Sequence, residues 1–163
     1  MHVATGLGQD SHRFEAAPTG KPLRIGGVTF EGPALEGNSD ADVLLHAVVN
    51  ALTGLHGQVV LGPVTDALCQ AGEMDSAAYV REALRHLGPL RLSHCSCSLE
   101  CLKPKLGPQI PALRARLAEL LDLPLRHVAV TAHSGEGLSA CGRGEGVHAS
   151  VILTALEDRS ASH

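Results

Sequence analysis

The chain has 163 residues, of which 44% are hydrophobic and 18% are charged, a balance typical of one globular domain and unlike that of a disordered chain. The formal net charge of −4 gives no basic surface for phosphate backbones, and with three aromatic residues there are few rings for bases to stack on. Nucleic acid is therefore excluded as an expected partner. Histidine is in surplus, with ten residues against three aromatic ones, and neutral imidazole is the commonest metal ligand.

The amino terminus lacks a basic region followed by an apolar run, so we predict no signal peptide. No apolar stretch approaches the roughly 20 residues that a membrane span requires. The five cysteines are an odd number in a chain long enough to fold without disulfides. We therefore expect a cytoplasmic protein with no membrane partner and no disulfide framework.

The predicted elements, in chain order, are strands over 3–10 and 23–30, a helix over 40–55, a loop with at most one short turn over 57–75, a helix from residue 76 to Gly88, a strand over 90–101, a helix over 109–122, and strands over 127–132 and 147–156. A turn or bulge at Gly26-Gly27 interrupts the second strand. The expected N-caps are Ser39 or Asp40 for the first helix and Ser76 for the second.

This order predicts an α+β fold: a single domain with one mixed β-sheet and helices packed on one face of it. The domain is expected to span residues 1–158, and residues 159–163 to form a frayed C-terminal tail.

The first candidate site is a metal centre made by Asp10, His12 and His46. Side chains at i and i+2 of a strand point the same way, and a helix packed over the strand end can add a third ligand. Three such ligands with an open fourth position are typical of catalytic zinc. Spacing alone favours a simpler interpretation, in which Asp10 caps a turn and His46 is a hydrogen-bonded core histidine.

Two further segments could hold an anion. The first is the helix start at Asn38-Ser39-Asp40-Ala41-Asp42, where free backbone N–H groups meet the positive end of a helix; a well-capped helix explains it equally well. The second is the glycine-rich stretch 133–146, in which Glu136 could hold a divalent cation that bridges phosphates; a flexible hairpin is the alternative.

A Cys-x-Cys pair, Cys95 and Cys97, with Cys101 beyond it, could in principle bind a metal. On a strand, however, Leu99 falls on the same face as these three cysteines, and leucine does not belong in a metal cage. We therefore interpret the cysteines as buried core residues.

Four segments together resemble the 2-C-methyl-D-erythritol 2,4-cyclodiphosphate synthase family. They are Gly6–Arg13 (GLGQDSHR), Ser39–His46 (SDADVLLH), Lys103–Pro108 (KPKLGP) and Gly142–Gly146 (GRGEG), and the resemblance extends over residues 3–157. It implies a homotrimer with active sites between subunits. It also implies a metal-dependent reaction of isoprenoid precursor synthesis, in which a cytidine-diphosphate-linked substrate cyclises and releases CMP.

The resemblance assigns roles to residues of this chain. Asp10, His12 and His46 would bind zinc, Glu136 a magnesium or manganese ion, and Asn38 and Ser134 would be catalytic groups beside the reacting phosphates. Substrate-contacting positions would be Asp10, His12, Asn38, Ser39, Gly62, Cys101, Leu102, Lys103, Pro104, Lys105, Leu106, Gly107, His133, Ser134, Glu136, Ala140 and Arg143. Arg143 and Glu145 would line a cavity on the trimer axis that can hold an isoprenoid diphosphate.

The chain departs from the family where the methylerythritol unit would bind. Asn38 stands where the family usually has histidine, Val60 where it has aspartate, and Gly137 where it has lysine. The loop 63–72 lacks the family's Phe-Pro-Asp-Thr-Asp segment, and Ala140 replaces an aromatic residue. Two hypotheses follow: an active synthase with a divergent sugar pocket, or a catalytically impaired or re-purposed trimer that keeps metal and nucleotide binding. A cysteine-based metal-handling protein is a third.

Overall fold

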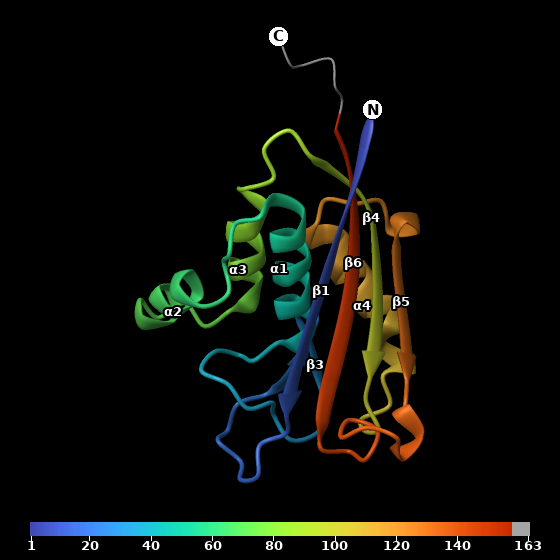
Figure 1. The fold of residues 1–163 in the computed structure, drawn as a ribbon. Helices are drawn as coiled ribbons and strands as arrows, with labels where there is room; N and C mark the ends of the chain where they lie inside the picture. The colour runs from blue at the N-terminus through green and yellow to red at the C-terminus, as the bar shows by residue number, and fades with distance from the viewer. Residues whose placement is uncertain (158–163) are drawn as a thin grey trace.

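The computed structural model describes residues 1–157, so the predicted tail at 159–163 lies outside the described residues. The elements are β1 (His2–Arg13), β2 (Leu23–Ile25), β3 (Val28–Phe30), α1 (Val43–His56), α2 (Pro63–Gln70), α3 (Ser76–Leu84), β4 (Arg91–Glu100), α4 (Ile110–Leu120), β5 (Val128–His133) and β6 (Gly146–Glu157) (Figure 1). Short 3-10 turns precede α4 and β5 and follow β5.

Four strands form one mixed sheet in the order β1-β6-β4-β5. β6 runs antiparallel to both β1 and β4, whereas β4 and β5 are parallel. The strands β1, β4 and β5 therefore point in the same direction, and their carboxyl ends meet at one edge of the sheet, the lower edge in Figure 1. The candidate metal ligands at the end of β1 therefore lie at the same edge as the segments 101–107 and 133–136, which stand at the ends of β4 and β5.

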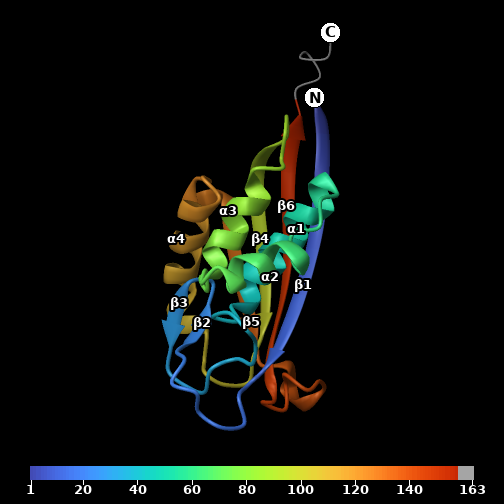
Figure 2. The same ribbon diagram turned by 90° about the vertical axis from the view of Figure 1, so that its left-hand side faces the viewer.

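The helices lie on one face of this sheet, and the other face carries none among the described residues (Figure 2). α1 packs across β1 and β6, α4 packs on β5, and α3 packs on α1 and α4. The predicted α+β fold, with a mixed sheet and helices on one face, is confirmed. Residues 23–30 form a hairpin turned at Gly26-Gly27, but its strands make a separate two-stranded sheet instead of joining the large one.

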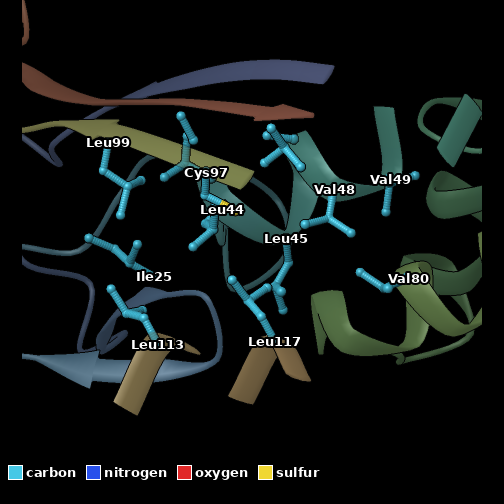
Figure 3. Close-up of a cluster of buried hydrophobic side chains, with 14 of the residues drawn as sticks. Ile25, Leu44, Leu45, Val48, Val49, Val80, Cys97, Leu99, Leu113 and Leu117 are labelled. Carbon is cyan, nitrogen blue, oxygen red and sulfur yellow. The ribbon is translucent and has the colours of Figure 1, made fainter. Parts of the chain in front are cut away.

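The core lies between the sheet and the helices and is built almost entirely from aliphatic side chains. Figure 3 shows Leu44 and Val48 of α1 between the sheet and Leu113 and Leu117 of α4. Cys97 belongs to the same cluster and is 2% exposed. Cys95 is also buried, and its Sγ lies 3.5 Å from that of Cys97. Burial in an apolar cluster is what the core interpretation of these cysteines predicts.

Two glycines let α1 approach β1 closely. A Cβ atom built on Gly6 or Gly8 would overlap the backbone of α1, at Ala51 for Gly6 and at Ala47 for Gly8. The helix that carries His46 therefore rests directly on the strand that carries Asp10 and His12. The glycines of β1 are thus part of the reason that the three side chains meet.

Asp42 joins the start of α1 to the β2–β3 hairpin. It is fully buried, and its carboxylate accepts hydrogen bonds from the backbone N–H groups of Gly26 (2.7 Å), Gly27 (2.6 Å) and Leu45 (3.0 Å). Burial raises the pKa of this carboxyl group against the lowering effect of these bonds. Because its side chain accepts the hydrogen bond from Leu45 N, Asp42 is the N-cap of α1.

The predicted N-caps were each wrong by one to three residues. Ala41 has a positive φ of 53°, which is not a helical conformation. The helix therefore begins only after Asp42, and Ser39 and Asp40 lie outside it. Asp75, and not Ser76, caps α3 through a bond from Ala77 N. Because α1 begins at Val43, His46 is its fourth residue and lies in the first turn.

The segment 57–75 contains the eight-residue helix α2 where the sequence predicts a loop with at most one short turn. Pro63 occupies the first turn, where a missing N–H is harmless, and the Thr65 hydroxyl bonds the backbone of Gly62. Only Thr65 of this helix is buried, so the segment has no apolar stripe by which it could have been predicted. Of the helices in residues 1–157, none is both long and apolar enough to cross a bilayer.

Candidate metal centre and adjoining cavities

Asp10, His12 and His46 meet at the carboxyl end of β1. Asp10 Oδ2 lies 2.8 Å from His12 Nε2 and 3.2 Å from His46 Nδ1, and the two ring nitrogens are 3.2 Å apart. Asp10 and His12 project together from the strand, as their i, i+2 spacing predicts, and His46 comes from the first turn of α1. Within residues 1–157 this is the one group of three or more His, Cys, Asp or Glu side chains whose ligand atoms come within 4.8 Å of one another.

The second nitrogen of each imidazole is held by a protein group. His12 Nδ1 lies 2.7 Å from the backbone carbonyl of Glu36, which can only accept, so this nitrogen carries the hydrogen. His46 Nε2 lies 2.9 Å from Ser76 Oγ. Each ring thus turns a different nitrogen, Nε2 of His12 and Nδ1 of His46, towards Asp10.

The electrostatics of the triad suit a cation at its centre. Burial raises the pKa of Asp10, but the imidazoles of His12 and His46 beside it outweigh this effect, and the pKa is lowered. The hydrogen bond to Asp10 in turn raises the pKa of His12 against the effect of burial. One carboxylate and two imidazoles, 24%, 20% and 12% exposed, form a partly open donor set that fits a divalent metal ion.

The residues predicted to contact the nucleotide and the second metal ion line two cavities at the same edge of the sheet, at the ends of β4 and β5. Cys101, Lys105, Leu106 and Gly107 enclose a cavity of about 200 Å³ with Ala132, His133 and Ser134. Glu136 lines a neighbouring cavity of about 380 Å³ with Glu100 and Ser139. The structure therefore brings the 101–107 segment together with Ser134, and it keeps Glu136 close to both.

The positions 38, 39 and 62 lie on the helical side of the molecule. Ser39 is buried and its Oγ accepts from Ala41 N, whereas Asn38 beside it is exposed. Ser39 lines a cavity of about 480 Å³ with Lys21, Arg24 and Asp40. Gly62 precedes α2, and Val60 is buried with an apolar side chain, so position 60 offers no polar contact.

The glycine-rich loop after β5 carries the remaining predicted residues. Ala140 lines a cavity of about 250 Å³ with His12, Cys141 and Glu145. Glu145 pairs with Arg13 at 3.0 Å and with Arg143 at 3.1 Å, and these hydrogen bonds lower the pKa of Glu145. The loop is thus tied back to the end of β1 by an exposed ion-pair cluster.

The fold and the triad define a class: single-domain α+β proteins with a candidate site for a divalent metal at the end of a sheet strand. The chain belongs to the YgbB family, whose model matches residues 3–156. A relative from Chlamydia muridarum named 2-C-methyl-D-erythritol 2,4-cyclodiphosphate synthase is 45% identical over 155 residues, which is 93% of this chain and 87% of the relative. The synthase of Chlamydia trachomatis serovar L2b is 44% identical over the same shares of the two chains.

Solved structures agree with these relatives. One of a 2C-methyl-D-erythritol-2,4-cyclodiphosphate synthase is 31% identical, with a TM-score of 0.78, and covers 93% of this chain and 99% of its own. A second, described as the CDP-bound form, is 30% identical with the same TM-score and coverage. The resemblance drawn from the four sequence segments is confirmed.

Several contacts at the site were missed by sequence reasoning. Lys21 Nζ donates to the carbonyl of Gly37 at 3.1 Å and pairs with Glu15 at 3.3 Å, which supports the loop that carries Asn38. Ser76 reaches His46 across 30 residues of sequence. No local pattern reveals these contacts: the sequence marks Ser76 only as a helix cap, and both residues reach segments that only the tertiary fold brings close.

Proposed function

We propose that this chain converts 4-diphosphocytidyl-2-C-methyl-D-erythritol 2-phosphate into 2-C-methyl-D-erythritol 2,4-cyclodiphosphate and CMP. An oxygen of the 2-phosphate attacks the β-phosphorus of the diphosphate, and the bond from that phosphorus to the oxygen of CMP breaks. This is a phosphorus–oxygen lyase reaction of isoprenoid precursor synthesis by the methylerythritol phosphate route. The observation that carries the proposal is the Asp10–His12–His46 triad at the open carboxyl edge of the sheet.

We infer that the triad holds zinc and that Glu136 holds a second divalent cation, Mg²⁺ or Mn²⁺. Two nitrogen donors and one carboxylate with room for a further ligand suit zinc, whereas an exposed carboxylate suits a harder ion. Bound cations would neutralise charge on the phosphate oxygens, which is the main requirement of phosphoryl transfer. The protein groups then have to align the phosphates, and we assign Asn38 and Ser134 to that task.

The cytidine end of the substrate is proposed to occupy the cavity of about 200 Å³ lined by Cys101, Lys105 and Gly107. Backbone groups of residues 101–107 can bond the edge of the cytosine, and Lys105 adds a positive charge for the diphosphate. A relative with the same fold is known in a CDP-bound form, which supports a ligand of this class. Ser39 and Gly62 would contact the methylerythritol phosphate.

A complete site is proposed to need two subunits of a homotrimer. Asp10 and His12 of the triad lie at the end of β1, whereas the nucleotide cavity lies at the ends of β4 and β5, beyond β6 in the order β1-β6-β4-β5. Two to three strand spacings of about 4.8 Å separate them by about 10–14 Å within one chain. The helix-free face of the sheet exposes Val3, Leu7 and Ile152, and Leu7 and Ile152 lie opposite each other in the ladder. Apolar surface of this kind favours contact with another subunit.

In such a trimer Arg143 and Glu145 would line an axial cavity, and the small side chain of Ala140 leaves room there for an isoprenoid diphosphate. The five cysteines of the chain are all free, which suits a reducing compartment, and we propose a cytoplasmic location.

The test is release of CMP from the cytidylylated substrate in the presence of zinc and magnesium, followed by chromatography, with the cyclic diphosphate identified by phosphorus NMR. His46→Ala removes one ligand of the triad and serves as the matched control. We expect turnover by the unaltered chain and loss of it in the variant. If the unaltered chain releases no more CMP than His46→Ala while it still binds zinc and CMP, the proposal fails, and the altered positions Asn38 and Val60 favour a re-purposed trimer.

A further inference from the structure

A chain of partly buried hydrogen bonds leads from His46 away from the triad. His46 Nε2 lies 2.9 Å from Ser76 Oγ, and the same hydroxyl contacts Asp40 Oδ1. Ser76 is fully buried at the start of α3, and Asp40 lies in the loop before α1. The start of α3 therefore meets the loop and first turn of α1 behind the imidazole, on the side opposite to Asp10 and His12.

The directions of these hydrogen bonds follow from the groups involved. An ionised carboxylate only accepts, so Asp40 must receive the hydroxyl hydrogen of Ser76. Reversing that hydrogen would leave two oxygens facing each other without a proton between them. The hydroxyl oxygen is then free only to accept, and its one remaining partner is His46 Nε2, which must carry a hydrogen.

Asp40 is itself held in place by backbone donors. Ser76 N donates to Oδ2 at 3.1 Å, and Asp42 N donates to Oδ1 at 3.2 Å. The backbone N–H of Asp40 donates in turn to Met74 O at 3.0 Å. These bonds join the start of α3 to the loop that precedes α1. They fix the position of the Asp40 carboxylate, which can therefore hold the Ser76 hydroxyl in one direction.

We propose that Asp40 and Ser76 are positioning residues that hold His46 in its Nε2–H tautomer and aim the lone pair of Nδ1 at the metal position. The inference rests on the proposed function, because it assigns a role towards the metal that the triad would bind. Ligand histidines are commonly oriented by such outer partners, whose loss lowers metal affinity about 10–100-fold. Here the carboxylate acts through a serine hydroxyl and not directly on the ring.

The experiment compares Ser76→Ala with the unaltered chain and with Ser93→Ala, which removes a partly buried hydroxyl that donates to Thr154 O in the sheet. Asp75 remains to cap α3 in Ser76→Ala, so the helix is expected to form. Zinc affinity of each metal-stripped protein is measured by competition with a chelator. The tautomer of His46 is read at pH 8 from two-bond nitrogen–proton correlations in histidine-labelled, metal-stripped protein.

We expect Ser76→Ala to bind zinc about 10–100-fold more weakly, with Ser93→Ala unchanged, and His46 to shift from Nε2–H towards Nδ1–H. The shift follows because Asp10 Oδ2, 3.2 Å from Nδ1, then becomes the stronger acceptor for the ring. A loss of affinity below threefold, or His46 as Nδ1–H in the unaltered chain, overturns the proposal.

Asp40→Asn keeps the test decisive if circular dichroism shows that Ser76→Ala is unfolded. A carboxamide can donate to the Ser76 hydroxyl, which frees the hydroxyl hydrogen for His46 Nε2 and favours the wrong tautomer. The same threefold criterion applies to this variant. Neither measurement uses substrate, so a protein that binds zinc as expected but releases no CMP would refute the proposed function and leave the inference standing.

Discussion

Replacing Asp42 by alanine is expected to lower the free energy of unfolding by about 4 kcal/mol. The carboxylate is fully buried and joins the β2–β3 turn to the first turn of α1 through the N–H groups of Gly26, Gly27 and Leu45. Its removal leaves these donors without their acceptor, at the point where the loop that leads to His46 becomes helical.

The magnitude follows from the burial of the three donors. Gly26 and Leu45 are buried, and an unsatisfied buried N–H costs about 1–3 kcal/mol, so these two account for about 2–6 kcal/mol. Gly27 is partly exposed, so water can replace the lost acceptor there. Relief of the buried charge, whose cost is visible in the raised pKa of Asp42, offsets part of the loss. Asp42→Asn retains one acceptor oxygen and is expected to lose about half as much.

The assay is equilibrium unfolding in urea followed by far-ultraviolet circular dichroism. Several protein concentrations are used because the proposed trimer would be stabilised by mass action. Glu31→Ala, an exposed carboxylate beyond β3, is the control and should change stability by less than about 0.5 kcal/mol. If Asp42→Ala stays within about 1 kcal/mol of the unaltered chain, the carboxylate does not hold the hairpin to α1 and the argument from its hydrogen bonds is refuted.

Three further predictions follow from the packing and the triad. Gly8→Ala places a Cβ atom into the backbone of α1 at Ala47 and should lower the free energy of unfolding by about 3 kcal/mol. The same urea assay measures it, and an unchanged unfolding midpoint would contradict the close packing of α1 on β1. The proposed zinc ion would have to displace the proton that the raised pKa of His12 retains, so apparent zinc affinity should rise from pH 6 to pH 8 with release of a proton. Calorimetry in buffers of different ionisation enthalpy measures both effects, and a flat pH profile would count against this reasoning. Ile152→Arg introduces a charge on the exposed sheet face and should shift the species seen by light scattering from trimer to monomer, and a trimer of unchanged mass would exclude that face as the interface.

The sequence alone determined most of the elements and the ligands of the candidate metal centre. Helical periodicity located α1, α3 and α4 because each buries an apolar stripe, and strand alternation located β4 because Cys95, Cys97 and Leu99 face one side. Strand spacing placed Asp10 and His12 on the same face, but by itself it favoured a turn cap and a core histidine, and the resemblance to the synthase family assigned them to a metal.

Only the tertiary structure decided which residues surround those ligands. α2 escaped prediction because it buries almost nothing, and Asp42 replaced the expected caps because the hairpin at Gly26-Gly27 supplies donors from 15 and 16 residues away. The contact of Ser76 with His46 likewise spans 30 residues. Periodicity and capping are local and are written in neighbouring residues, whereas the orientation of a ligand depends on hydrogen bonds between segments that meet only when the core forms.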